Sequence, residues 1–183
     1  MPSGNESYSR IEDSDFMFEN EVVSVTATRD SPRIDLIGFS VGPIKEGNEY
    51  EVRLWIAREL ENDGIVKIRD VTLDASRLYK IQWTERIQAV GQLSSLPGGF
   101  YPRLRRLIDD LKAASKSNPE KIREYEYIQN LSQDIVNCRL RKIVSLASLP
   151  TSESQILKNL TVEERELCER LHRIISEWRL KII

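Results

Sequence analysis

The side chains in this 183-residue sequence that could carry out acid–base chemistry include two pairs of adjacent carboxylates. Asp109 and Asp110 form one pair, and Glu163 and Glu164 form the other. Adjacent residues on a helix point about 100° apart, so neither pair can converge on one substrate atom as a general acid and base would. We therefore expect both pairs to lie on solvated helix faces.

Histidine and cysteine, which often bind metals or act in nucleophilic catalysis, are scarce. His172 is the only histidine, which excludes two-histidine metal sites and leaves a serine or cysteine triad without a setting. Cys138 and Cys168 are not in zinc spacing, and each lies on an apolar helical stripe, which predicts reduced core thiols. The motifs GxxxxGKS/T, GxGxxG, HExxH and GxSxG are absent. We expect no catalytic residue, no cofactor and no metal, and the chain is not predicted to be an enzyme.

Basic residues are concentrated between Gly98 and Leu146, where ten Lys and Arg stand against six Asp and Glu, a local charge of +4. A Gly-Gly turn at the start of this region could cradle a phosphate through backbone N–H groups, although a plain interhelix turn is the commoner outcome. The residues that would face nucleic acid are Arg103, Arg105, Arg106, Lys112, Arg141 and Lys142. The whole chain has a formal net charge of -2, so we expect weak DNA binding at most. A small nucleic-acid-binding module using the basic helices of residues 100–142 is kept as the alternative function.

The order of secondary-structure signals predicts an α+β protein, with a small N-terminal β-rich domain of about three strands and one helix before an all-α domain. Residues 1–16 are acidic and rich in Ser, Asn and Asp, which predicts a disordered tail. In the β-rich domain, residues 17–71, β-branched residues predict two strands joined by a turn and a third strand from about Ile65. Leu54 and Trp55 belong to a short helical stripe between them.

Residues 72–183 predict helices almost throughout, with well-marked boundaries. Asp74 and Asn118 stand where N-caps are expected, and Asn118 precedes a proline at the first helical position. Thr161 and Glu164 have the spacing of a capping box. The last helix carries bulky apolar residues up to the end of the sequence, so we expect it to dock against its own domain or another subunit.

From about Phe18 to the C-terminus, the joint pattern of these elements resembles a subunit of the GINS complex. The stretches that carry the resemblance are a β-strand, then IDLIGFSVGPIKEGNEYEVRLWIARELENDGIVKI, GGFYPRLRRLI, NCRLRKIVSLAS and NLTVEERELCERLHRIISEWR. The element order is similar to the archaeal class in which a small B domain precedes a helical A domain. That class is the counterpart of the eukaryotic partner-of-Sld-five two and three subunits. The acidic residues before Phe18 have no match in this pattern.

The resemblance implies a non-catalytic DNA replication factor for initiation and elongation, which scaffolds and activates the MCM replicative helicase with a RecJ-like or Cdc45-like partner. It implies a 2:2 heterotetramer with a sister GINS subunit of the A-domain-first type, and a link to primase. DNA contact would be weak or indirect. The sequence also has no membrane-length apolar run and no signal-peptide core, so we expect an intracellular protein. The resemblance implies a location in the cytoplasm or nucleoid, in an archaeal replisome.

The A-domain helices of this family build the core of the tetramer, which implies subunit contacts on the helix after the Gly-Gly turn and on the last helix. The residues expected to make these contacts are Phe100, Tyr101, Leu104, Leu107, Leu171, Ile174 and Trp178. For each of them, packing inside the A domain's own core is an equally open interpretation. Leu54 and Trp55 are instead expected in the core of the B domain.

Overall fold

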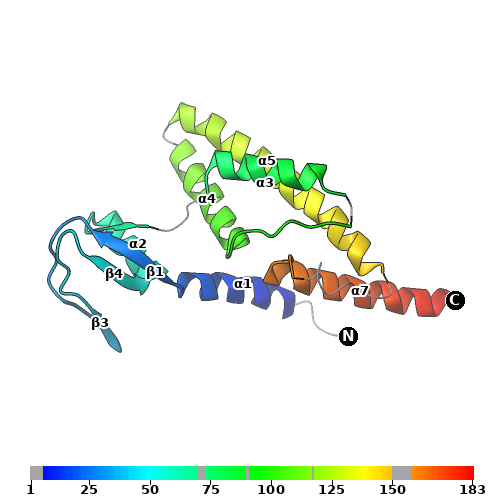
Figure 1. Cartoon of the computed structure of the whole chain (residues 1–183), viewed down its shortest axis with the longest axis horizontal. Helices are drawn as coiled ribbons and strands as arrows, with labels where there is room; N and C mark the ends of the chain where they lie inside the picture. Colours follow the sequence, from blue (N-terminus) through cyan, green and yellow to red (C-terminus); the bar gives the residue numbers. More distant parts are fainter. Residues whose placement is uncertain (1–5, 70–72, 90, 117, 150–157) are drawn as a thin grey trace. The chain divides into compact units, whose positions relative to one another are not determined.

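The chain divides into two compact units, which we call unit 1 (Met1–Thr72) and unit 2 (Leu73–Ile183). The computed structural model describes residues 6–69, 73–89, 91–116, 118–149 and 158–183. Unit 1 contains a small sheet with helices, and unit 2 is helical (Figure 1). The predicted fold class, a small β-rich domain followed by a helical domain, is confirmed. The predicted domain boundary near residue 71 lies outside the described residues.

Unit 1 is built on an antiparallel sheet of strand order β4-β1-β5, with a separate two-stranded ribbon of β2 and β3. Its elements are α1 (Glu6–Glu19), β1 (Val22–Ala27), β2 (Ile34–Leu36), β3 (Phe39–Val41), β4 (Glu49–Arg53), α2 (Leu54–Asn62) and β5 (Val66–Ile68). Alternation along β1 places Val23, Val25 and Ala27 on one buried face. Leu54 and Ile56 of α2 are buried in the same apolar cluster, so the helix covers that face of the sheet.

The structure differs from the prediction for the β-rich domain, residues 17–71, in two places. The stretch that leads into α2 is a strand, β4, and the Gly-Pro region contributes the β2-β3 ribbon, so there are more strands than the three expected. Leu54 is buried, as expected, but Trp55 is 37% exposed, and its prediction as a core residue is wrong. Adjacent helix residues point in different directions, so only one of the two can face the sheet.

Helix α1 occupies most of the acidic segment that the sequence predicts to be disordered, so that prediction is wrong for the described part of the segment. Phe18, in the last turn of α1, is buried in the apolar cluster of unit 1. Glu19 accepts a hydrogen bond from Arg58 of α2 at 2.7 Å. Apolar burial and this ion pair stabilise a helix that the composition of the segment does not indicate.

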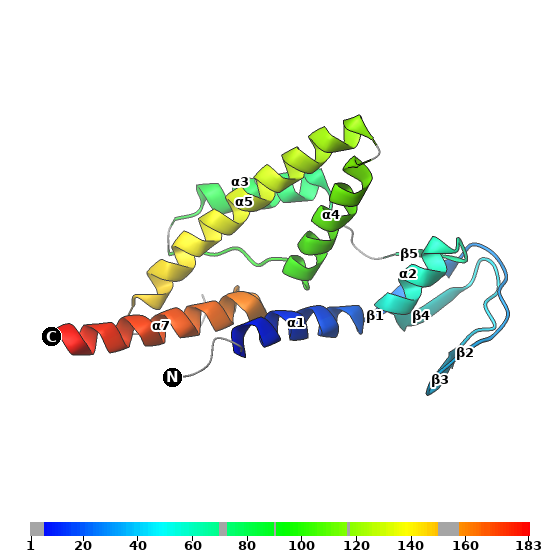
Figure 2. The ribbon, with the colours of Figure 1, turned by 180° about the vertical axis from the view of Figure 1, so that it is seen from behind.

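Unit 2 consists of helices that pack on one long helix, α5. Its elements are α3 (Ala75–Ile87), α4 (Phe100–Ser115), α5 (Pro119–Ala147) and α7 (Val162–Ile182). Helices α3, α4 and α7 each contact α5, and Figure 2 shows α3 and α4 beside it. The predicted N-caps are confirmed: Asp74 accepts a hydrogen bond from a backbone N–H at 2.8 Å and Asn118 from another at 2.9 Å. Thr161 and Glu164 form the predicted capping box.

Two apolar clusters fill unit 2. The first cluster joins α3, α4 and α5 through residues that include Leu78, Phe100 and Ile135. The second cluster joins α5 and α7 through residues that include Ile143 and Cys168. Helix α5 contributes to both clusters because its apolar residues recur at intervals of three and four over its whole length.

Candidate functional site

Among the residues that the structure describes, no group of His, Cys, Asp and Glu side chains is arranged to hold a metal. His172 has a packing role: its Nδ1 lies 3.0 Å from the carbonyl oxygen of Ala147, which joins α7 to the end of α5. Cys138 and Cys168 are free thiols, and burial raises the pKa of Cys168. None of the described helices is long and apolar enough to cross a membrane. Two other features of unit 2 stand out, a buried group of charges and a set of exposed apolar faces.

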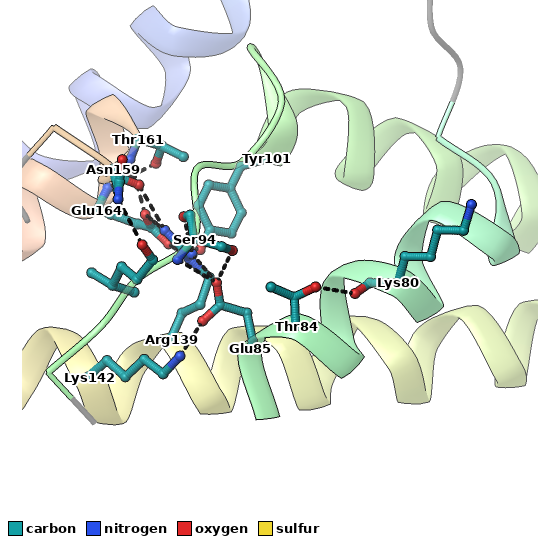
Figure 3. Close-up of polar contacts among 11 residues, drawn as sticks. Lys80, Thr84, Glu85, Ser94, Tyr101, Arg139, Lys142, Asn159, Thr161 and Glu164 are labelled. Carbon is teal, nitrogen blue, oxygen red and sulfur yellow. Dashed lines mark hydrogen bonds and ion pairs between the residues drawn. The ribbon is translucent and has the colours of Figure 1, made fainter. Parts of the chain in front are cut away.

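Four ionisable side chains meet inside unit 2 and form what we call the charge cluster: Glu85, Arg139, Lys142 and Glu164 (Figure 3). The Arg139 guanidinium binds both carboxylate oxygens of Glu164, from Nε to Oε1 at 2.5 Å and from Nη2 to Oε2 at 2.7 Å. Glu85 bridges the two cations, with Oε1 2.6 Å from Arg139 Nη1 and Oε2 2.7 Å from Lys142 Nζ. No side chain of the cluster is more than 5% exposed, so two cations and two anions neutralise one another away from water.

Two members of the charge cluster, Glu85 and Arg139, are held in their ionised forms by opposite charges. Burial by itself would raise the pKa of Glu85, but hydrogen bonds from Lys142 and Ser94 and the charge of Arg139 outweigh it, and the pKa lies below its usual range. Burial would lower the pKa of Arg139, but its hydrogen bonds to Glu164 and the charge of that carboxylate raise it. Removing one member would leave a buried charge uncompensated.

The charge cluster also binds the backbone around it. Arg139 donates to the carbonyl of Ser94 at 3.0 Å and to the carbonyl of Asn159 at 3.1 Å. The Tyr101 hydroxyl donates to Glu164 at 2.7 Å, and burial together with this carboxylate raises the pKa of Tyr101. These contacts come from α3, α4, α5, α7 and the segments between them, so the cluster fixes how the helices of unit 2 are placed relative to one another.

Exposed apolar side chains of unit 2 form stripes with a four-residue period. On α7, Ile174, Trp178 and Ile182 follow one another at this spacing, and we call them the α7 stripe; Ile174 and Trp178 are each 62% exposed. The same spacing recurs at Tyr79, Trp83 and Ile87 on α3 and at Val136, Leu140 and Val144 on α5. Residues four apart lie on the same helix face, and contiguous exposed apolar faces of this kind mark protein–protein contact sites.

Three of the residues predicted to contact a subunit have other roles in the structure. Phe100 and Leu104 are 1% and 4% exposed in the first apolar cluster of unit 2, so their side chains have no surface to offer a partner. The prediction that these two residues contact another subunit is therefore withdrawn. Tyr101 is partly buried, and its hydroxyl is bound to Glu164.

The other predicted contact residues divide into two groups. Leu107 and Leu171 are half-buried against the first and second apolar clusters of unit 2. Ile174 and Trp178 are exposed on the α7 stripe. A subunit contact through these two residues stays a prediction, and the structure adds Ile182 to their face.

The residues predicted to face nucleic acid are not equally accessible. Lys142 is 4% exposed and bound to Glu85, so the prediction that it faces DNA is wrong, because its charge is already neutralised inside the fold. The remaining five are Arg103, Arg105 and Arg106, which are half-buried, and Lys112 and Arg141, which are exposed. The nucleic-acid alternative thereby loses one of its six cations.

Local sequence patterns do not reveal the charge cluster. Its partners are far apart in the sequence, and Glu164 was identified only as part of the capping box and of a carboxylate pair. The prediction that this pair lies on a solvated helix face is wrong for Glu164, which is 3% exposed because Arg139 binds it inside the fold. One signal was available: Arg139 stands four residues after Ile135 and four before Ile143, in the middle of an apolar stripe. A cation at such a position requires a buried anion from another element.

Comparison with known proteins gives consistent results for both units. The family model of the GINS complex protein helical bundle domain matches residues 72–183, and that of the PSF2 N-terminal domain matches residues 10–69. The human protein named DNA replication complex GINS protein PSF2 is 28% identical over 154 residues, which cover 82% of this chain and 79% of the human protein.

Proposed function

Since this chain belongs to the GINS family, as a subunit related to PSF2, we propose that it is a non-catalytic scaffold subunit of a DNA replication complex. Its direct partner is a sister GINS subunit, and the α7 stripe contributes to the contact. The observation that carries this proposal is the exposure of Trp178 and Ile174 on one face of a helix whose opposite side packs into unit 2. Burying such large apolar side chains against a partner helix removes them from water and stabilises the assembly.

Light scattering on a size-exclusion column tests the proposal, with the chain alone and co-expressed with the sister subunit from the same genome. We expect a stable four-chain complex with two copies of each subunit. Trp178→Asp should remove the complex while leaving the circular-dichroism spectrum of the chain unchanged. Val162→Asp is the matched control, because Val162 is 78% exposed on another side of the same helix.

The outcomes separate two parts of the proposal. If the wild-type chain does not bind the sister subunit, the proposed scaffold function is wrong. A complex that forms normally with Trp178→Asp would show that the α7 stripe is not the contact, whereas the scaffold function would stand.

At the next level, the assembled complex joins the MCM helicase ring and a RecJ-like or Cdc45-like protein, with primase as a further partner. The family membership supports this expectation, and the site of action would be wherever the cell replicates its DNA. Adding the complex to purified MCM and measuring strand unwinding tests it. We expect stimulation that requires the assembled complex, and no ATP hydrolysis by the complex itself.

A further inference from the structure

Strand β4 is an edge of the sheet, and its backbone register shows which groups face outward. The N–H of Leu54 donates to the carbonyl of Glu21, and the N–H of Ala27 donates to the carbonyl of Asn48. Both pairs belong to the same antiparallel register as the β1-β4 pairing, in which hydrogen-bonded pairs alternate with non-hydrogen-bonded pairs. The backbone groups of residues 50 and 52 therefore face β1. Those of residues 49, 51 and 53 face away from it, and the described part of the chain pairs no other strand with this edge.

A groove of about 250 Å³ runs beside this open edge and is formed by unit 1 alone. One side is β4 itself, from Tyr50 to Arg53, and the other side includes Val41 at the end of β3. Ile56 of α2 contributes an apolar wall. The side chains of Tyr50 and Val52 lie on the sheet face that packs against α2, so alternate positions of any strand added here would point toward these apolar residues. We call this site the β4 groove.

We propose that the β4 groove binds an extended segment of another protein, which adds to the sheet as an antiparallel strand beside β4. This binding mode takes its affinity from main-chain hydrogen bonds and its specificity from alternate side chains. The site belongs to unit 1 and is independent of the subunit contact proposed for the α7 stripe.

The charges along β4 define the chemistry of the segment. Glu49, Glu51 and Arg53 are exposed and share one face of the strand; Glu49 is also paired with Arg69, and Arg53 donates to Asn20 Oδ1 at 3.0 Å. Opposite charges directly across an antiparallel pair are favourable, and like charges are not. Read from its N-terminus, an antiparallel partner segment lies opposite Arg53, then Glu51, then Glu49. Its complementary pattern is acidic, apolar, basic, apolar, basic, with the apolar residues directed toward the groove.

A second copy of β4 fits this edge poorly. Symmetric pairing over the whole strand places Glu51 opposite its own copy, which brings two carboxylates together. A register that pairs Glu51 with Arg53 instead is confined to the last three residues of the strand, because α2 begins at Leu54. A separate segment has neither restriction.

A capped synthetic peptide of the order Thr-Glu-Val-Lys-Val-Lys-Thr tests the proposal on the full-length chain. Binding is followed by NMR, and we expect slower hydrogen exchange at the backbone amides of Glu51 and Arg53. Methylating the backbone nitrogen of the central lysine, which should donate to β4, is expected to weaken binding by about tenfold. Methylating a valine nitrogen, which points away, should change the affinity by less than about twofold.

Charge variants of the protein provide the second arm of the test. Glu51→Lys should weaken peptide binding by about fivefold. A peptide with glutamate in place of its central lysine should bind this variant with the original affinity. Glu59→Lys is the matched control, because Glu59 is exposed on α2 and does not line the groove. Equal effects of the two methylated peptides, or no protection of the Glu51 amide at saturating peptide, would overturn the proposal. Protection of this amide by dimerisation of the chain alone would also overturn it, since the occupant would then be a second copy.

Discussion

Arg139 and Glu164 form a two-point ion pair in the interior of unit 2, with both carboxylate oxygens bound by one guanidinium and both side chains at most 3% exposed. Glu164 also caps the start of α7, and Arg139 also binds Glu85 of α3. A single cation therefore connects the helix that carries the proposed subunit contact to the rest of the unit.

Replacing Arg139 should destabilise unit 2 strongly. Arg139→Met is expected to lower the free energy of unfolding by about 3–5 kcal/mol. The substitution removes the cation that neutralises the buried carboxylates of Glu164 and Glu85. Urea unfolding followed by circular dichroism measures the change. Arg141→Met is the control, since Arg141 is exposed two residues away and should change stability by less than about 0.5 kcal/mol. Similar stability of the two variants would contradict the role assigned to the cluster.

Arg139→Lys should not restore the wild-type stability. An ammonium group cannot present the planar fork that binds both oxygens of Glu164 together with Glu85. The same urea titration should place this variant nearer to Arg139→Met than to the wild type. A lysine variant as stable as the wild type would show that charge alone, without geometry, accounts for the cluster.

Stability should fall in acid partly through Glu85. Its pKa is lower in the folded chain than in the unfolded chain, where it is about 4.3, so the folded state binds fewer protons. The contribution is complete above that value and is lost as pH falls through the lower folded pKa. Unfolding free energies measured between pH 7 and pH 3 should therefore decline less steeply in Glu85→Gln than in the wild type. Glu126→Gln, at an exposed position, should keep the wild-type slope.

Phe18 should anchor α1 to unit 1, whereas Phe16 should not. Phe18→Ala is expected to cost about 3–5 kcal/mol, because its ring is 6% exposed in the apolar cluster. Phe16→Ala, two residues earlier and 68% exposed, is the matched control and should be nearly neutral. Hydrogen exchange read at the α1 amides would distinguish them, with faster exchange only in Phe18→Ala. Equal exchange in both variants would mean that α1 is not held by this ring.

Phe100 and Trp178 should have opposite effects on stability and assembly. Phe100→Ala should lower the melting temperature of the isolated chain, since the ring is buried, at a cost of about 3–5 kcal/mol. Trp178→Ala should leave the melting temperature nearly unchanged and weaken the complex with the sister subunit. Thermal unfolding and size-exclusion chromatography measure the two effects. A destabilised Trp178→Ala chain would indicate that this tryptophan supports its own unit.

Features that depend on nearby residues were predictable from the sequence. The caps at Asp74, Asn118 and Thr161 form hydrogen bonds to backbone groups within three residues, so the short sequence context contains both partners. The order of the β-rich and helical parts was predictable for the same reason, because hydrophobic period and turn residues act locally.

The sequence alone therefore determined the fold class, the starts of α3, α5 and α7, and the family pattern. The tertiary structure decided which apolar residues face inward: Phe100 and Trp178 both fit helical stripes, but only contacts with distant helices bury the first and leave the second exposed. It also decided that Lys142 is a buried partner of Glu85, 57 residues away, where the local sequence indicates a solvated basic helix. Burial and charge pairing are properties of neighbours in space, and a single sequence gives no direct record of which distant residues become neighbours.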